Sequence, residues 1–188
     1  MLFPLIETIA VENGKLQNLA YHQQRYRQAL AEYYPNQAVV MRNLSDITPP
    51  PEFQQGLVRC RIDYNATQQQ ERFFPYQRRL IRTFQPVICD QIDYHLKFSD
   101  RTLLEQLYAQ RNGRDEIMIV KQGLITDCSI GNLILLQNGI WYTPEKPLLY
   151  GTQRAKLLAE NRILLCDIRI QDLQQYSEIR VINALNTL

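Results

Sequence analysis

The order of apolar and polar residues predicts a strand, a tight turn and a helix at the start of the chain. The apolar residues of 2–6 lead into 7–11, a strand that ends at Glu12-Asn13-Gly14. Apolar and aromatic residues then recur at helical spacing from Leu19 to Tyr34, directly before Pro35. Because proline cannot continue an α-helix, we expect the helix to end there.

A second set of strands is expected after the run Pro49-Pro50-Pro51, which no helix can cross. Residues 57–64 alternate between apolar and polar, as a half-buried strand does. Two further strands are expected at 71–75 and 78–83. The sequence Phe84-Gln85-Pro86 then looks like a crossover between two halves.

The second half mixes short strands with scattered helices. It opens with the irregular stretch 94–100, and Asn138-Gly139 is a strong hairpin signal. Helices are expected at 101–110, 152–161 and 171–175, and strands at 116–121, 124–127, 132–136, 140–142, 163–170 and 179–182. This pattern predicts an α+β fold with mixed sheets. We expect two lobes, a small N-terminal α/β lobe of residues 1–84 and a C-terminal lobe of residues 85–188.

Composition and charge narrow the possible functions. The chain has 188 residues and a formal net charge of +2. That charge gives no general attraction to nucleic acid or to a membrane surface. No apolar run approaches the roughly 18 residues of a membrane-spanning helix, and the start lacks a signal-peptide pattern. We therefore expect a cytoplasmic protein without a membrane or nucleic-acid partner.

The cysteines show no metal-binding or redox spacing, so we expect free thiols, most of them buried, and no metal site. They are Cys60, Cys89, Cys128 and Cys166. A disulfide or a zinc site stays open as an alternative.

Lys97 is a candidate for chemistry, in an irregular segment between Leu96 and Phe98. If its neighbours desolvate the amine, its pKa falls and the neutral form can attack a carbonyl group. The alternative is a lysine whose charged end reaches solvent.

Two other segments could bind charged groups. Asp127 follows an apolar strand, where its carboxylate could face a buried cation or could cap a turn. Gly151-Thr152 precedes a helix, so the backbone N–H groups of Thr152 and Gln153 could bind a phosphate. An ordinary N-cap threonine is the alternative.

The first helix carries His22-x-x-Arg25, which places both residues near one face. Arg25 could bind a phosphate through its guanidinium group, or could form a surface salt bridge. We interpret His22 as a hydrogen-bonded structural residue rather than an acid–base group.

Taken in order along the chain, these motifs resemble the class IV aminotransferase family, the fold-type IV pyridoxal phosphate enzymes. The motifs are Glu7-Thr8, His22-x-x-Arg25, Leu96-Lys97, Asp127-x4-Asn132, Leu149-x-Gly151-x-x-Arg154 and Ile182-Asn183-Ala184-Leu185. The resemblance implies a two-lobed architecture like that of D-amino-acid aminotransferase, shortened at the N-terminus.

The resemblance also implies roles for individual residues around pyridoxal 5'-phosphate. Lys97 matches the lysine that binds the cofactor aldehyde and then moves the substrate's α-proton. Asp127 matches the acid that pairs with the pyridine nitrogen, which is usually a glutamate. Arg25, Thr152 and Gln153 match phosphate-binding positions. Asn183 and Ala184 match a turn near the cofactor and the substrate carboxylate.

The reaction implied is closest to that of 4-amino-4-deoxychorismate lyase, which eliminates pyruvate to give 4-aminobenzoate on the folate route. A small class IV aminotransferase that passes an amino group to an α-keto acid is the alternative, since the same lysine and acid serve both reactions. A degenerate homologue without activity is a further alternative. The family usually forms homodimers and acts on small amino compounds, so we expect both here.

Overall fold

A computed structural model describes residues 2–188, and the chain divides into two compact units. Unit 1 runs to Arg78 and also contains Leu96–Asp100; unit 2 contains Arg79–His95 and Arg101–Leu188. The sequence suggested one boundary after residue 84, which puts residues 96–100 in the second lobe. The chain instead returns to unit 1 there, because Ile6 N–H donates to the Lys97 carbonyl oxygen at 2.9 Å.

A four-stranded antiparallel sheet with the order β2-β1-β3-β4 forms the frame of unit 1. Its strands are β1 (Leu5–Glu12), β2 (Lys15–Leu16), β3 (Leu57–Tyr64) and β4 (Gln69–Pro75). The pairing of β1 with β3 runs from Leu5 opposite Tyr64 to Glu12 opposite Leu57. The strand predicted at 57–64 is thereby confirmed.

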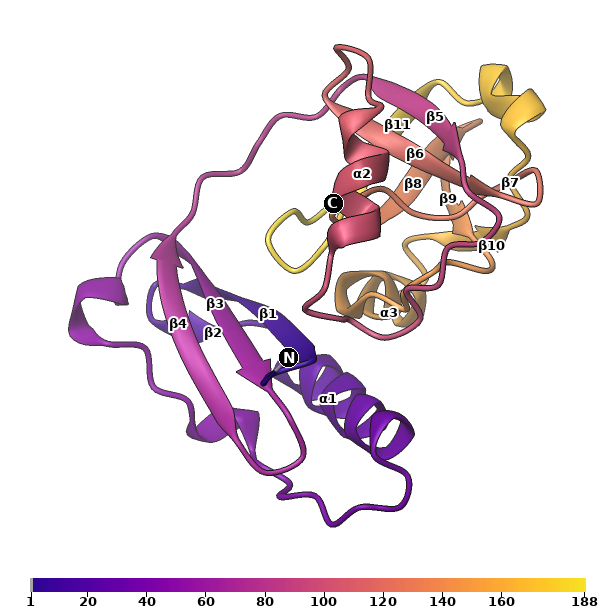
Figure 1. The fold of residues 1–188 in the computed structure, drawn as a ribbon. Helices are drawn as coiled ribbons and strands as arrows, with labels where there is room; N and C mark the ends of the chain where they lie inside the picture. Colours follow the sequence, from indigo (N-terminus) through magenta and orange to yellow (C-terminus); the bar gives the residue numbers. More distant parts are fainter. Residues whose placement is uncertain (1) are drawn as a thin grey trace. The chain divides into compact units, whose positions relative to one another are not determined.

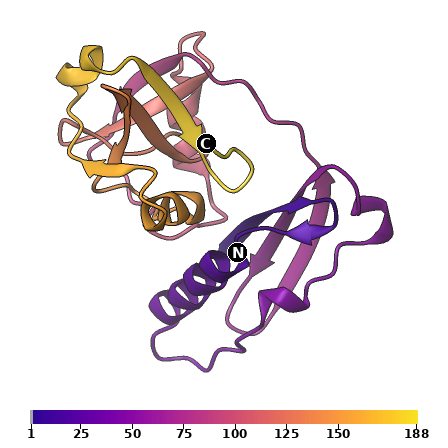
Figure 2. The same ribbon diagram turned by 180° about the vertical axis from the view of Figure 1, so that it is seen from behind.

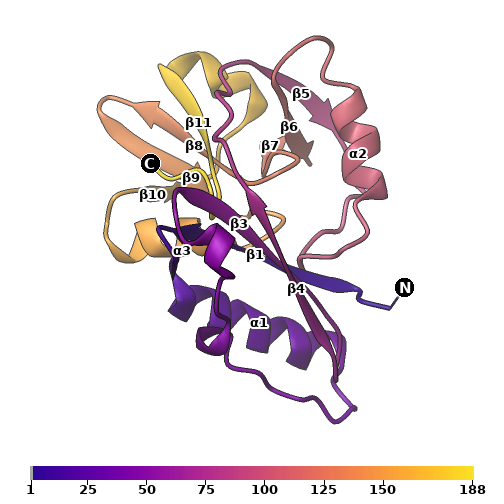
Figure 3. The same ribbon diagram turned by 90° about the vertical axis from the view of Figure 1, so that its left-hand side faces the viewer.

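The helix α1 (Leu19–Tyr33) covers one face of this sheet (Figure 1). Its buried residues Tyr26, Ala29 and Leu30 pack against the apolar side chains that β1 and β3 turn toward the same side. The helix ends just before Pro35, as the sequence predicts. Short 3-10 helices at Leu44–Asp46 and Pro51–Phe53 lie on the connection to β3. Figure 3 shows α1 and the strands of the sheet from the side.

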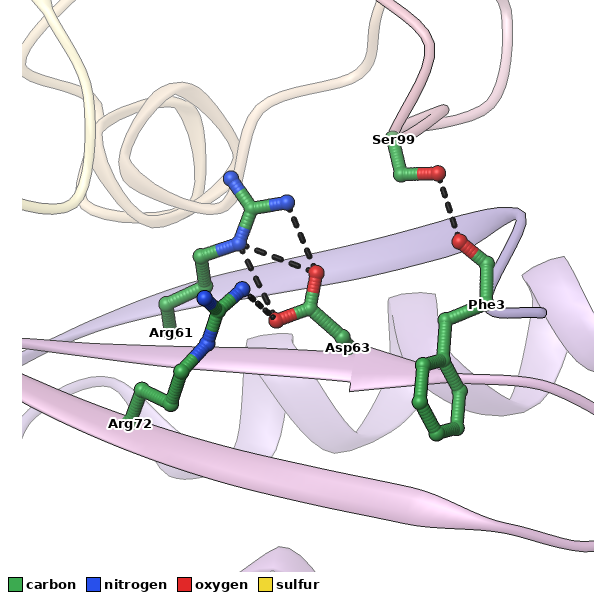
Figure 4. A network of polar contacts seen from close by, with 5 residues as sticks. All are labelled: Phe3, Arg61, Asp63, Arg72 and Ser99. Carbon is green, nitrogen blue, oxygen red and sulfur yellow. Dashed lines mark hydrogen bonds and ion pairs between the residues drawn. The ribbon is translucent and has the colours of Figure 1, made fainter. Parts of the chain in front are cut away.

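The other face of the sheet is polar in part (Figure 4). Arg61 and Arg72 both bond the carboxylate of Asp63, with Nη2–oxygen distances of 2.7 Å each. The Ser99 hydroxyl donates to the Phe3 carbonyl oxygen, which adds a further contact between Leu96–Asp100 and the start of the chain.

Unit 2 contains two sheets and two α-helices (Figure 2). One sheet has the order β10-β9-β8-β11 and the other the order β5-β6-β7. The elements are β5 (Phe84–Ile88), α2 (Thr102–Ala109), β6 (Glu116–Lys121), β7 (Leu124–Ile125), β8 (Asn132–Gln137), β9 (Ile140–Pro144), α3 (Thr152–Ala159), β10 (Leu164–Cys166), the 3-10 helix Ile170–Gln175 and β11 (Glu178–Ile182). Parallel and antiparallel pairs occur together, which confirms the expected mixed α+β fold.

The hairpin predicted at Asn138-Gly139 joins β8 to β9. Both turn residues have positive φ, 51° for Asn138 and 79° for Gly139. Asparagine and glycine are the residues that adopt this conformation most readily, so the local sequence determines the turn.

Two expectations for the region 78–88 are wrong. Residues 78–83 form no strand, because the Asp115 carboxylate accepts the backbone N–H groups of Arg82 and Thr83, which removes them from strand pairing. Residues 84–88 form β5 rather than a simple crossover. Pro86 is tolerated there because β5 is an edge strand that pairs only with β6.

Three further observations concern the described residues. The four cysteines are free, with Cys60 and Cys128 buried and Cys89 and Cys166 partly buried. No group of His, Cys, Asp or Glu side chains is arranged to hold a metal ion within residues 2–188. Across the same residues, the helices are too short or too polar to cross a membrane.

Candidate functional site

The first group of predicted site residues lies between β1 and α1. Glu7 is on the face of β1 that packs against the helix, and it has no exposed surface. Arg25 donates to this carboxylate from Nε to Oε1 at 2.7 Å and from Nη2 to Oε2 at 2.6 Å. His22 Nδ1 lies 2.8 Å from the same Oε2. The one-turn spacing of His22 and Arg25 thus lets both reach one buried acid.

The charges in this cluster support one another. Burial by itself would raise the pKa of Glu7, but the Arg25 charge and the hydrogen bonds from His22 and Arg25 outweigh it and lower that pKa to about 2. Burial lowers the pKa of His22, while Glu7 acts in the opposite direction. The cluster therefore holds an ionised acid, a cationic arginine and a neutral histidine at pH 7. His22 is therefore hydrogen-bonded, as the sequence predicts, and its structural role stays a prediction.

Lys97 lies beside β1, in the Leu96–Asp100 segment. Its carbonyl oxygen is bonded to Ile6 N–H, and Phe98 pairs with Leu5 as an isolated bridge. Ile6 directly precedes Glu7, and the Lys97 charge is one of the influences that lower the pKa of His22. The side chain is half-buried. Arg25 and Lys97 are thereby brought together within unit 1 although 72 positions separate them (97 − 25 = 72).

The second group of predicted residues surrounds Asp127 in unit 2. Asp127 is 4% exposed and directly precedes a short loop that leads into β8. Its Oδ1 accepts from Asn132 Nδ2 at 2.6 Å, and its Oδ2 accepts from Leu149 N–H at 2.9 Å. Asn132 Nδ2 also donates to the Leu149 carbonyl oxygen at 2.8 Å. The acid is therefore tied to the loop that precedes α3.

Burial dominates the electrostatics of Asp127. It raises the pKa of this carboxyl group to about 6. The backbone N–H groups of Leu149 and Leu148, the Asn132 amide and the Arg154 charge favour ionisation, but they offset only part of the effect of burial. A buried carboxylate in this state is suited to pair with a cationic donor.

The start of α3 is closely packed against the same residues. A Cβ atom added to Gly151 would lie 2.0 Å from Asn132 Oδ1, so only glycine fits at this position. Gly151 is the N-cap of α3, and no side chain caps the helix there. Thr152, Gln153 and Arg154 in the first turn are buried. Backbone N–H groups at a helix N-terminus attract anions.

The predicted turn at Asn183 and Ala184 follows β11. Asn183 Oδ1 accepts from Leu185 N–H and Asn186 N–H, both at 2.9 Å, and from Asn186 Nδ2 at 3.1 Å. Its Nδ2 donates to the Ile130 carbonyl oxygen at 3.1 Å, which ties this turn to the loop after Asp127. The Asn183 side chain thus shapes the backbone of the turn, and Ala184 is partly buried within it.

The predicted residues therefore form two sets, one in each unit. Arg25 and Lys97 belong to unit 1, and Asp127, Thr152, Gln153, Asn183 and Ala184 belong to unit 2. The sequence reasoning assigned no role to Glu7 or Asn132. Glu7 could have been found as the one acid on the apolar side of a strand, opposite a helix with His22 and Arg25.

The sequence matches a known family and a full-length relative. The family model described as amino-transferase class IV matches residues 95–188, the second half of the chain. An uncharacterized protein of Haemophilus influenzae is 55% identical over 188 residues, and the match covers both chains completely.

Solved structures extend the match to the whole chain. A Haemophilus somnus protein with the provisional name 4-amino-4-deoxychorismate lyase is 51% identical, with a TM-score of 0.94 over 100% of this chain and 99% of that one. A Mesorhizobium loti protein with the provisional name amino-acid aminotransferase is 22% identical, with a TM-score of 0.83 over 99% of this chain and 97% of that one. This last similarity shows the shared fold.

Proposed function

The chain belongs to the class IV aminotransferase family, and from this premise we propose that it is an enzyme that uses pyridoxal 5'-phosphate (PLP) on a small amino compound. The family is PLP-dependent. The observation that carries the proposal is the buried Asp127 carboxylate, bonded to the loop from which α3 begins.

The residues of this chain fit the cofactor in their chemistry. A protonated pyridine nitrogen would provide the cation that a buried acid such as Asp127 requires. Gly151, the N-cap of α3, has no side chain that could cap the helix, and a helix N-terminus suits a phosphate. Lys97 is held by backbone bonds beside β1, so its amine is on an ordered segment.

Each residue has a proposed task. When bound, PLP withdraws electrons from the substrate carbon and makes its proton acidic. Lys97 Nζ would hold the cofactor aldehyde until the substrate amine displaces it, and the released amine would then move that proton. Asp127 accepts the hydrogen bond of the ring nitrogen. Arg25, oriented by Glu7, is the phosphate-binding candidate of unit 1, and the N–H groups of Thr152 and Gln153 are the phosphate-binding candidates of unit 2.

Asn183 and Ala184 are proposed to contribute to the pocket through their backbone. The Asn183 side chain holds this turn in shape through four hydrogen bonds, so its task is to position the main chain.

For the reaction, we propose pyruvate elimination from an aminodeoxychorismate-like substrate. The support is the full-length match at 51% identity to the Haemophilus somnus protein with that provisional name. Transamination to an α-keto acid is the second candidate, because the M. loti protein of similar length has an aminotransferase name. We also propose a homodimer, as is common in the family, which light scattering of the purified chain tests.

Borohydride reduction tests the cofactor proposal. The purified chain with added PLP should show a visible absorption band that reduction abolishes, and peptide mapping should place the adduct on Lys97. Lys97→Ala should lose the band and the adduct. Lys15→Ala, which removes an exposed lysine of the same unit, should keep both. An unchanged band in Lys97→Ala would refute the role of this lysine.

Two assays separate the reactions. One measures release of 4-aminobenzoate from aminodeoxychorismate, and the other measures consumption of an α-keto acid with an amino donor. Transamination without aminobenzoate release would overturn the lyase assignment in favour of the second candidate. A chain that binds PLP but supports neither reaction would be a non-catalytic homologue.

A further inference from the structure

Arg154 is a buried cation to which the proposed function gives no task. The residue is 4% exposed and lies in the first turn of α3. Its Nη2 donates to the carbonyl oxygens of Pro144 at 2.8 Å and Glu145 at 3.3 Å. Its guanidinium carbon lies 5.7 Å from the centre of the Tyr150 ring. Buried arginines are usually paired with acids, so these contacts call for an explanation.

The contacts of Arg154 leave its charge unneutralised at short range. Within the described residues it makes no ion pair with a carboxylate, and its buried Nε has no hydrogen-bond partner. Carbonyl oxygens offset only part of the cost of burying a guanidinium group. Burial accordingly lowers the pKa of Arg154, although the group stays cationic.

The loop 145–151 connects Arg154 to Asp127. Arg154 bonds the first residue of this loop and the residue before it, and Leu149 near the end of the loop donates to Asp127 Oδ2. Asn132 bonds both Asp127 Oδ1 and the Leu149 carbonyl oxygen. A buried cation and a buried anion thus hold the two ends of one seven-residue loop.

Arg154 is a cation whose charge acts on Asp127. Burial raises the pKa of Asp127, whereas neutral donors and the Arg154 charge lower it. The adjacent Cys128 thiol has a pKa raised by burial, so it is uncharged. Glu116, the other buried acid of this region, accepts a hydrogen bond from Ser129 at 2.9 Å. The Arg154 charge therefore favours ionisation of Asp127 together with the hydrogen bonds from Leu149, Leu148 and the Asn132 amide.

We propose that Arg154 is a positioning residue whose buried charge holds Asp127 in its carboxylate form, ready to accept the hydrogen bond of the cofactor ring nitrogen. Burial favours a protonated, neutral Asp127 that could not pair with a pyridinium group, and the Arg154 charge acts against this together with the hydrogen bonds from Leu149, Leu148 and Asn132. The role of the Asp127 carboxylate toward the cofactor rests on the proposed function. The effect of the Arg154 charge on Asp127 does not depend on that function.

The test follows the side-chain carboxyl carbon of Asp127 by ¹³C NMR across a pH titration of the full chain without added PLP. Asp127→Asn assigns the signal. Arg154→Gln removes the charge but keeps an amide donor, and Arg154→Lys keeps the charge but loses the guanidinium fork. Arg162→Gln, at an exposed arginine of unit 2, is the matched control. Amide spectra establish that each variant is folded.

The wild type, Arg154→Lys and Arg162→Gln should titrate near pH 6, the value for the wild-type structure. Arg154→Gln should titrate about one pH unit higher. An unchanged midpoint in folded Arg154→Gln would overturn the proposal. A midpoint in Arg154→Lys as high as in Arg154→Gln would also overturn it, because shape rather than charge would then be responsible. If Arg154→Gln does not fold, a wild-type midpoint above about 7 would refute the proposal, since Asp127 would be protonated despite Arg154.

A PLP titration of the same variants separates this inference from the proposed function. Arg154→Gln should bind PLP about tenfold more weakly than the wild type, while Arg162→Gln should bind it equally well. A wild type that binds no PLP would refute the proposed function, and the NMR midpoints would still decide the link between Arg154 and Asp127.

Discussion

Glu7 and Arg25 form a two-pronged ion pair between β1 and α1, with nitrogen–oxygen distances of 2.7 Å and 2.6 Å. The Glu7 side chain is fully buried, and the Arg25 side chain is 14% exposed. The buried Glu7 carboxylate therefore fixes the orientation of the Arg25 guanidinium group. A phosphate-binding role for Arg25 depends on this support, because a mobile arginine would lose more entropy on binding.

Removal of the Glu7 carboxylate should destabilise the protein. In Glu7→Ala, Arg25 and His22 lose their common acceptor, and we expect the free energy of unfolding to fall by about 3 kcal/mol. Urea unfolding measures the change. Glu12→Gln removes one partner of the exposed pair with Arg78, and it should cost less than about 1 kcal/mol. Equal effects of the two substitutions would contradict the importance of the buried pair.

Stability should fall in acid because of the same cluster. The folded pKa of Glu7, about 2, lies below its unfolded value of 4.5, so its contribution is complete above pH 4.5 and is lost as pH falls toward 2. The difference corresponds to about 3 kcal/mol. The lowered pKa of His22 acts in the same direction below pH 6.5, because the unfolded chain then binds a proton that the folded chain resists.

Urea unfolding from pH 7 to pH 3, followed at amide signals of unit 1, measures this pH dependence. Glu7→Gln should flatten the profile below pH 4.5. A wild-type profile that stays level down to pH 3 would show that Glu7 is not held ionised by Arg25 and His22.

A methyl group at Gly151 should disturb the Asp127 region. In Gly151→Ala, Cβ would lie 2.0 Å from Asn132 Oδ1, and we expect a loss of about 1–3 kcal/mol as Asn132 moves. The loss should shrink in an Asn132→Ala background, because the clashing atom is then absent. Urea unfolding of the single and double variants measures the coupling, and purely additive effects would exclude a direct clash.

Asn183 should matter for the shape of its turn. Asn183→Ala removes an acceptor of three hydrogen bonds and a donor of one, and we expect a loss of about 2–3 kcal/mol. Asn183→Asp keeps the acceptor and loses only the donor to Ile130, so it should cost roughly half as much. Thermal or urea unfolding compares them. An Asn183→Ala variant as stable as wild type would rule out this role.

Much of the fold follows from local sequence. The alternation in Leu57–Tyr64 specifies β3, and Asn138-Gly139 specifies the hairpin between β8 and β9, since both signals act between near neighbours. The candidate residues Arg25, Lys97 and Asp127 could likewise be selected from ordered motifs along the chain. The motifs do not predict which other residues these three contact.

Only the tertiary structure decided which groups meet. The strand expected at 78–83 is absent because Asp115, more than thirty positions away, takes the backbone N–H groups of Arg82 and Thr83. Glu7 meets Arg25, and Asn132 meets Leu149, across 18 and 17 positions. Because these groups are buried, leaving one of them without a partner would cost free energy of folding. Burial depends on how the whole chain packs, so a local pattern of residues does not predict it.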